Sequence, residues 1–357
     1  MKGLRFAKRP RVLTIGVLAV GAALAVVSPL AAGLPTTFHV TRLVSDQPGA
    51  AQPPDPDLVN AWGLVSGPTT PWWVSDNGTN KSTLYRGSDG QKQGLVVTVA
   101  GGPTGTVFNS TAGFVLPSGG KALFLFDTEN GLVRAWNGAQ GTTAIRVADR
   151  SDVDAVYKGL ALANTPAGPR LFAADFHNKR IDVFDTNFTL VPNSGFVDPS
   201  LPHRFAPFNV QVIGTRVFVA YAKQDDQGKD EEPGPGKGFV DVYDLSGNLL
   251  GSLDDGRGQL NAPWGLAVAP PTFGTFAGDL LVGNFGDGLI NAYREDSPNH
   301  FVHDGKIRGA DNRPLAIDGL WALQFGQGGN NGPAGTLFFT AGPAGESQGL
   351  FGQINPN

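Results

Sequence analysis

The chain has 357 residues, of which 50 are glycine and 27 are proline, while only 16% are charged. This composition suits many short strands joined by tight turns and argues against long amphipathic helices. A formal net charge of -4, without a basic stripe interleaved with aromatic residues, excludes nucleic acid as an expected partner. The absence of cysteine excludes disulfides and thiolate metal sites.

The first 33 residues have the order of a secretory signal peptide. Basic residues up to Arg11 precede an uncharged run at residues 12–27, and Ala31, Ala32 and Gly33 follow. Because the apolar run is shorter than the roughly 20 residues of a spanning helix, we expect cleavage near Ala32 or Gly33 rather than an uncleaved anchor. The mature protein is then secreted or held in the cell envelope, with no membrane segment.

Six similar apolar runs recur along the rest of the chain, each followed by a second run, an acidic or amide turn and a third run. They cover residues 62–65, 112–115, 158–161, 208–211, 264–267 and 321–324. The first five are 50, 46, 50 and 56 residues apart, counted between Gly63, Gly113, Gly159, Asn209 and Gly265. This period is typical of four-stranded propeller blades. The sequence therefore predicts an all-β, six-bladed β-propeller over residues 36–357, with blades starting near residues 60, 109, 157, 206, 261 and 318.

The last blade lacks a fourth strand of its own, because its third run ends near residue 354. Residues 38–44 alternate like a strand and precede the first blade. We expect this N-terminal strand to pair with residues 350–354 and to close the ring. Such pairing removes an open sheet edge.

The fourth blade is interrupted by an acidic stretch at residues 223–237 that is rich in glycine and proline. Its like charges and breakers predict that it buries little apolar area. We expect a mobile, solvated loop there.

Several of these segments together carry a resemblance to a known family. They are residues 60–64, 221–226, 238–243, 261–266, 282–288 and 337–342. The chain resembles a family of exported bacterial six-bladed β-propellers, conserved hypothetical proteins that are distantly similar to NHL-repeat propellers. The resemblance implies fold and export, and it implies no particular reaction.

Polar residues are expected to converge around the channel, because inner-strand starts and second-strand ends lie on one face of a propeller. The candidate ligand-binding residues are Asn60, Lys158, Asp175, His177, Asn209, Tyr221 and Asn284. An Asp that follows a strand has an alternative role in closing its own turn, and His177 has the alternative of an exposed hairpin residue. Lys158 offers a contact for an acidic ligand.

Calcium is the cofactor to consider at such a face, because Ca²⁺ prefers carboxylate and amide oxygens and calcium-dependent lactonase propellers use the same face. The chain departs from the lactonase pattern in two ways. None of its five glutamates, Glu129, Glu231, Glu232, Glu295 and Glu346, falls on an inner strand. Lys158 would also repel a cation. The cofactor is thus unassigned, with Ca²⁺ as an alternative.

Three tryptophans, Trp62, Trp264 and Trp321, recur at inner-strand starts. Packing between blades is the expected role, and a stacking platform for carbohydrate or another polymer is the alternative, which requires exposed rings. We interpret the chain as a monomeric ligand-binding or interaction scaffold, with a small molecule, a polysaccharide or a protein as the partner at the channel face. A hydrolase or lactonase that uses a divalent cation at the channel mouth is the alternative function.

Overall fold

The computed structural model describes residues 1, 34, 36–51, 53–192, 194–254 and 258–357. The chain divides into two units, residues 1–33 and 34–357, and the predicted signal peptide and its cleavage site lie outside the described residues. The second unit contains 23 strands, five short 3₁₀ helices and, within the described ranges, no α-helix. No helix in the described part of the chain is long and apolar enough to cross a membrane.

The strands form five sheets. Two four-stranded sheets come first in the chain, β2 (Ala61–Val65), β3 (Trp72–Asp76), β4 (Lys81–Tyr85) and β5 (Lys92–Thr98), then β6 (Pro103–Phe108), β7 (Phe124–Thr128), β8 (Leu132–Trp136) and β9 (Ile145–Asp149). A three-stranded sheet follows, with β10 (Tyr157–Thr165), β11 (Gly168–Asp175) and β12 (Arg180–Phe184). The sheet that ends the chain has the order β1 (Phe38–Ser45), β23 (Leu350–Pro356), β22 (Leu337–Ala341) and β21 (Leu320–Phe325).

An eight-stranded sheet contains the remaining strands as two antiparallel runs of four. One run is β13 (Phe205–Ile213), β14 (Arg216–Lys223), β15 (Gly238–Asp244) and β16 (Leu249–Asp254), and the other is β17 (Pro263–Val268), β18 (Leu280–Asn284), β19 (Ile290–Ser297) and β20 (His300–Lys306). A short parallel pair between β16 and β20, with Leu253 opposite Phe301, joins the two runs. The 3₁₀ helices are η1 (Asn77–Thr79), η2 (Gly138–Gln140), η3 (Ser151–Val153), η4 (Gly274–Phe276) and η5 (Gly329–Asn331).

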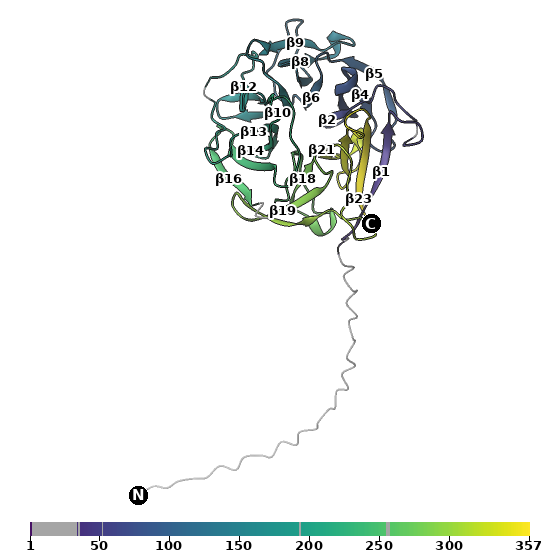
Figure 1. Cartoon of the computed structure of the whole chain (residues 1–357), viewed down its shortest axis with the longest axis vertical. Coiled ribbons are helices and arrows are strands. Elements are labelled where there is room, and N and C mark those ends of the chain that lie inside the picture. Colours follow the sequence, from purple (N-terminus) through teal and green to yellow (C-terminus); the bar gives the residue numbers. More distant parts are fainter. Residues whose placement is uncertain (2–33, 35, 52, 193, 255–257) are drawn as a thin grey trace. The chain divides into compact units, whose positions relative to one another are not determined.

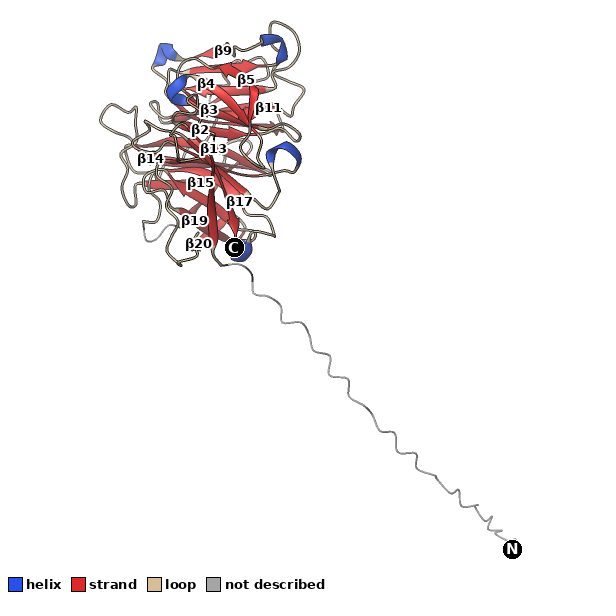
Figure 2. Ribbon diagram, turned by 90° about the vertical axis from the view of Figure 1, so that its right-hand side faces the viewer, coloured by secondary structure: helices blue, strands red, loops and turns tan. Residues whose placement is uncertain are grey.

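The sheets surround a common centre, which defines a β-propeller (Figure 1). In the view turned by 90°, the strands stack as successive layers with the 3₁₀ helices at the periphery (Figure 2). Near the centre, the first strands of the two runs of the eight-stranded sheet are also joined by a side-chain hydrogen bond, from Asn209 Nδ2 on β13 to the Trp264 carbonyl on β17, at 2.7 Å. Apolar side chains fill the space between sheets, and a separate cluster around Trp62 and Trp321 fills the centre.

Five of the six predicted inner runs lie within strands β2, β10, β13, β17 and β21. The prediction for residues 112–115 is wrong, because the first strand of its sheet is β6, residues 103–108, rather than a strand starting near 109. Phe114 is buried in a loop with φ +61°. The apolar pattern missed β6 because Thr104 and Thr106 are polar yet buried there, and Thr104 Oγ1 lies 2.8 Å from Asp127 Oδ1.

The strand predicted at residues 38–44 is present as β1, which pairs antiparallel with β23 so that Val40 lies opposite Ile354. Phe38 anchors the start of β1: its ring lies 4.8 Å from that of Phe273 between centroids, and its N–H donates to the Arg308 carbonyl at 2.8 Å. The N-terminal strand therefore packs against the loop that precedes β18 as well as pairing with the last sheet.

We predict that Phe38→Ala lowers the free energy of unfolding by about 3–5 kcal/mol, because it leaves a cavity among buried aromatic rings. Urea denaturation at equilibrium measures this loss. His39→Ala is the control, since His39 is exposed on the same strand, and it should change the free energy far less. Equal effects of the two substitutions would show that β1 adds little to the core.

Candidate functional site

Lys158 is a buried cation at the start of β10. Only 1% of its side chain is exposed, and its ammonium donates to Glu129 Oε1 at 2.7 Å and to Asp230 Oδ1 at 3.1 Å. Glu129 follows β7, whereas Asp230 belongs to the long connection between β14 and β15. Burial alone would lower the pKa of Lys158, but Glu129, Glu231 and Asp230 hold that pKa above its ordinary value. The ammonium therefore stays charged at neutral pH.

A polar network runs from Lys158 to turns and strand starts of three other sheets. Glu129 Oε2 accepts from Asn77 Nδ2 at 2.9 Å, and Asn60 Nδ2 donates to Asn77 Oδ1 at 3.3 Å and to Glu346 Oε2 at 2.7 Å. We call this set, Asn60, Asn77, Glu129, Lys158 and Glu346, the mouth network. It links turns that are up to 286 residues apart in the chain, so the folded ring is required to form it.

The carboxyl groups around Lys158 differ in protonation. Burial alone would raise the pKa of Glu129, but Lys158 and Asn77 hold that pKa below its ordinary value. Burial raises the pKa of Glu231 to about 8, although Lys158 opposes the shift, and burial also raises the pKa of Glu346. At neutral pH the site thus contains a carboxylate, an ammonium and a carboxylic acid that keeps its proton.

An aromatic plug of Trp62, Trp264, Trp321 and Phe285 lies beside the mouth network. The ring of Trp321 stacks on Trp62, with centroids 3.7 Å apart, and on Phe285, with centroids 4.1 Å apart. The ammonium of Lys158 lies 5.1 Å from the Trp62 ring centroid, within reach of a cation–π interaction. The three tryptophans are at most 6% exposed, which confirms the core-packing interpretation and leaves no exposed indole platform.

The plug blocks the channel along the ring axis. A cavity of about 300 Å³, lined by the far ends of first strands at residues such as Val65, Leu162 and Gln324, opens on the opposite side. A separate cavity of about 20 Å³, whose lining includes Asn209, Leu266 and Trp264, lies next to it. A ligand of the mouth network would therefore bind above the plug and could not pass through it.

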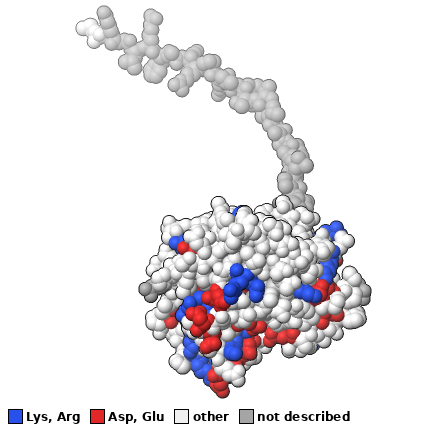
Figure 3. All heavy atoms as spheres, turned by 90° about the horizontal axis from the view of Figure 1, so that it is seen from above, with Lys and Arg blue, Asp and Glu red and all other residues white. Residues whose placement is uncertain are grey.

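The stretch at residues 224–237 is exposed at several positions, as expected, among them Asp226 and Asp230, but specific bonds also hold it against the ring, which the prediction of a mobile loop did not foresee. Besides the contact of Asp230 with Lys158, Gln224 Nε2 donates to the Phe176 carbonyl at 2.6 Å and the Gly234 N–H donates to Asn261 Oδ1 at 2.6 Å. Glu232 pairs with lysines at both ends of the loop, Lys223 at 2.8 Å and Lys237 at 2.5 Å. The acidic charges that suggested repulsion are matched by cations of the surrounding strands. The view of the surface from above likewise shows Lys and Arg interspersed with Asp and Glu (Figure 3).

The structure brings some of the predicted site residues together. Asn60 and Lys158 belong to the mouth network, and His177 Nδ1 lies 3.2 Å from the Gly228 carbonyl of the loop. Asn209 is 2% exposed and is bonded to Trp264 as described above. Asn60, Lys158 and His177 are therefore at or next to the mouth, whereas Asn209 lines the small cavity beside the plug.

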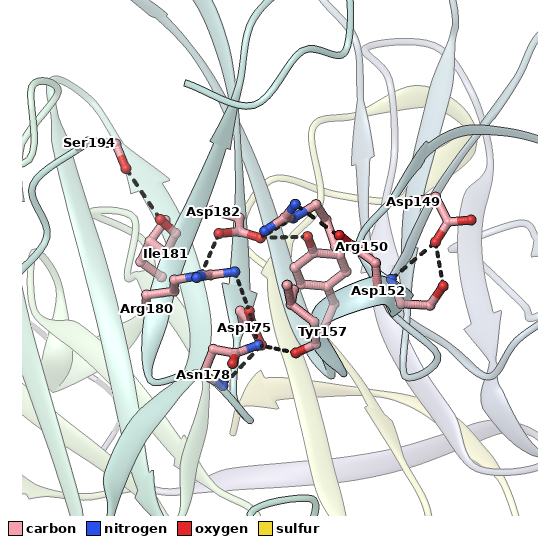
Figure 4. Close-up of polar contacts among 12 residues, drawn as sticks. Asp149, Arg150, Asp152, Tyr157, Asp175, Asn178, Arg180, Ile181, Asp182 and Ser194 are labelled. Carbon is pink, nitrogen blue, oxygen red and sulfur yellow. Dashed lines mark hydrogen bonds and ion pairs between the residues drawn. The ribbon is translucent and has the colours of Figure 1, made fainter. Parts of the chain in front are cut away.

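The expected convergence fails for Asp175, Tyr221 and Asn284. Asp175 accepts from Asn178 Nδ2 at 2.8 Å and pairs with Arg180 at 3.4 Å (Figure 4). The Tyr221 hydroxyl lies 2.7 Å from that of Tyr243, between two sheets. Asn284 Nδ2 donates to the Gln259 carbonyl at 2.9 Å and to Asp287 Oδ1 at 3.1 Å. Asp175 and Asn284 bond within or beside their own turns, and Tyr221 points into an interface between blades.

Sequence reasoning missed Asn77, Glu129, Asp230, Glu231 and Glu346. The search for glutamates was restricted to inner strands, whereas these residues lie in turns and loops of the same face. Asn77 directly follows Asp76, the last residue of β3, and Glu129 directly follows Thr128, the last residue of β7. Extending the search from the strand end into the turn would have found them.

A divalent cation does not fit this donor set. Within the described ranges, no group of three or more His, Asp or Glu residues is arranged to bind a metal ion. The carboxylates at the mouth instead surround the ammonium of Lys158. We therefore derive no step through calcium.

Comparison with known proteins gives a family. The fold is that of a β-propeller, and no family model matches the sequence. The chain belongs to the family of "Uncharacterized protein L690" of Acanthamoeba polyphaga mimivirus, to which it is 32% identical over 306 residues, covering 80% of this chain and 78% of the relative. "Uncharacterized protein R648" of the same virus is 31% identical over 305 residues, covering 81% and 74%. These relatives are viral, whereas the sequence resemblance implied a bacterial family.

Solved structures show the same fold. The chain is similar to a streptogramin B lyase with a TM-score of 0.51 and 12% identity, covering 91% of this chain and 100% of the lyase. It is also similar to a structural genomics protein of unknown function from Bacteroides thetaiotaomicron, with a TM-score of 0.55 and 11% identity, covering 89% and 76%. At such low identity the likeness establishes the propeller fold and no activity.

We predict that Lys158→Met lowers the free energy of unfolding by about 2–4 kcal/mol, because it leaves Glu129 without its cation in a largely buried site. The double variant Lys158→Met/Glu129→Gln should lose less free energy of unfolding than the sum of the losses in the two single variants, by about 1–3 kcal/mol. Urea denaturation of all four proteins gives the cycle. Lys229→Met, at an exposed lysine of the loop, is the control. Additive costs would mean that the pair is not coupled.

A second prediction concerns Asp127, which is fully buried at the end of β7. The Thr104 hydroxyl lies within hydrogen-bond distance of both Asp127 Oδ1 and the Tyr157 carbonyl, at 2.8 and 2.9 Å. One hydroxyl proton cannot serve two acceptors, so a protonated Asp127 that donates to Thr104 satisfies the group. Burial raises the pKa of Asp127 to about 7, in agreement with this arrangement.

Because this pKa is raised in the folded state, the stabilisation that protonated Asp127 provides has its full size below about pH 4, the ordinary pKa of an Asp in the unfolded chain. It is lost as the pH rises towards 7, since the unfolded chain releases the proton first. The change that Asp127→Asn causes in the free energy of unfolding should therefore be more favourable at pH 8 than at pH 4, by about 4 kcal/mol. Urea denaturation at both values measures the difference, and Asp311→Asn, at a side chain 63% exposed, is the control. An equal effect of Asp127→Asn at both pH values would contradict the assignment.

Proposed function

We propose that the protein is a six-bladed propeller that binds a small polar ligand above the aromatic plug, at the mouth network. Support for six blades comes from the eight-stranded sheet, because among the described residues its two antiparallel runs of four pair as strands only at the short β16–β20 pair. With the four smaller sheets they make six units. In this proposal β1 closes the ring on the last blade by its pairing with β23.

We also propose export of the mature chain, released from the segment up to Gly33, as a monomer. This rests on the order of basic, apolar and small residues at the start of the sequence. A polysaccharide or a protein is an alternative source of the bound group, provided that it presents a chain end or side chain small enough to enter the mouth.

The observation that carries the binding proposal is the burial of Lys158 beneath carboxylates that solvent reaches. Removing a charge from water costs several kcal/mol, and an apolar side chain would fill the same space without that cost. The exposed fraction of the side chain is 1% for Lys158, 33% for Glu129 and 71% for Asp230. An incoming ligand thus meets hydrogen-bond acceptors first, which favours hydroxyl or ammonium groups.

An acidic ligand, which Lys158 suggested in the sequence, is disfavoured by the same geometry. The ammonium of Lys158 already donates to Asp230, so an anionic ligand would have to displace the Asp230 carboxylate. Glu129 is ionised beside it and would repel the anion. The ligand class that these contacts favour is a small polyol or an amine.

The binding proposal is tested by calorimetry with a neutral hexose, an alkyl diamine and a dicarboxylate. We expect the hexose or the diamine to bind more tightly than the dicarboxylate. Glu129→Gln and Asn77→Ala should each weaken that binding about tenfold, since each removes one hydrogen bond to the network. Asp311→Asn should leave it unchanged. Preferential binding of the dicarboxylate, or binding that survives both substitutions, would move the site elsewhere.

Acid–base catalysis is a second candidate, favoured by one observation. Glu129 and Glu231 interact with the same ammonium, yet the pKa of Glu129 is lowered and that of Glu231 is raised to about 8. Carboxyl groups whose pKa values are pushed apart can serve as base and acid. Ester or lactone hydrolysis by the wild type that falls strongly in both Glu129→Gln and Glu231→Gln would favour catalysis over simple binding.

A further inference from the structure

A second cavity lies at the side of the ring, away from the mouth network. We call it the side pocket; its volume is about 810 Å³. One wall is the last sheet, with Val40 on β1, Phe339 on β22 and Leu350 on β23. The other wall is residues 316–318, which are attached to the neighbouring sheet because the Ile317 N–H donates to the Gly288 carbonyl at 3.0 Å.

The floor of the side pocket is apolar and well packed. Ile317 is 6% exposed, Leu350 is 7% exposed and Phe339 is fully buried. Such side chains give an organic ligand an apolar surface, and the volume falls within the range of small-molecule sites, about 300–1,000 Å³. The mouth network shares no residue with this lining, so the inference does not rest on the proposed function.

The rim of the side pocket carries an uncompensated cation. Arg42 lies opposite Gly352, which lies opposite Phe339, so Arg42 and Phe339 share a face of the sheet. Among the described residues, the Arg42 side chain makes no hydrogen bond or ion pair. An exposed guanidinium with all its donors free is suited to a planar acidic group, which it can bind through two parallel hydrogen bonds.

One carboxylate, that of Asp318, also lines the side pocket. It accepts from the Ala344 N–H at 2.9 Å and lies too far from Arg42 to form an ion pair. It leaves Arg42 free and disfavours a second negative charge on a ligand. The chemistry of the pocket is thus an apolar floor, one free cation at the rim and room for one acidic group.

We propose that the side pocket binds an amphipathic small molecule, with its apolar body on Val40, Ile317 and Leu350 and a single negatively charged group on Arg42. The acidic group receives the guanidinium hydrogen bonds at the rim, and the body displaces water from the floor. A carboxylate and a sulfonate are both compatible with the fork of donors that Arg42 presents.

The test uses two fluorescent probes, anilinonaphthalene sulfonate, which is apolar with one negative charge, and Nile red, which is apolar and neutral. The wild type should bind both saturably. Arg42→Gln should weaken binding of the sulfonate probe about tenfold, the loss of one charge-assisted contact, and leave Nile red unchanged. Ala316→Trp, at an exposed residue of the lining, should fill the pocket and abolish binding of both.

Arg313→Gln is the matched control, because the Arg313 side chain is 86% exposed and does not line the pocket. It should leave both probes unaffected. If Ala316→Trp does not fold, Ala50→Trp, at a lining residue that follows β1, fills the pocket instead. Absence of saturable binding to the wild type, equal affinity of the sulfonate probe for Arg42→Gln, or binding that survives the tryptophan variant would overturn the proposal.

Discussion

The close approach of neighbouring first strands at the centre of the ring is the constraint on which the rest of the structure depends. A Cβ added at Gly105 would lie 2.2 Å from the backbone nitrogen of Leu160, and one at Gly159 would lie 2.2 Å from Asn209 Oδ1. Similar contacts at Gly63 and Gly265, 2.3 and 2.6 Å from the next strand, show the same approach elsewhere in the ring. Only glycine leaves room for the neighbouring strand at such distances. This packing brings the strand starts close enough for side chains of different sheets to form one polar network.

The first strands could be read from the sequence because most of them are short apolar runs with a small residue near the start. The method failed at β6, where Thr104, Gly105 and Thr106 replace the apolar run. The threonines are buried, but their hydroxyl groups are satisfied by neighbouring strands. Hydrophobic periodicity cannot detect a strand whose burial is supported by hydrogen bonds rather than by apolar side chains. In the nearby run at residues 112–115 only Phe114 is buried, with its ring against that of Phe188, whereas Val115 is exposed.

The candidate site was only half visible in the sequence. Asn60 and Lys158 precede or begin first strands, so blade geometry placed them correctly at the mouth. Their partners come from turns and from the loop at residues 224–237, whose like charges had predicted that it would not pack against the ring. Glu129, Asp230 and Glu346 become neighbours of Lys158 only when three separate segments close around it, and no local pattern encodes that meeting. Conversely, Tyr221 lies near the end of a second strand, but its side chain points to the face between blades. A one-residue change in register decides which face a side chain joins.

The stacked rings of Phe285, Trp321 and Trp62 form a barrier across the centre of the ring. Its rings are stacked at van der Waals distance and lie between the mouth and the cavity on the opposite side. The cavity on the opposite side and the mouth network share no residue. A substitution that reshapes that cavity at Gln324 or Leu162 therefore leaves the side chains of the mouth network in place, so the two ends of the ring can be altered independently.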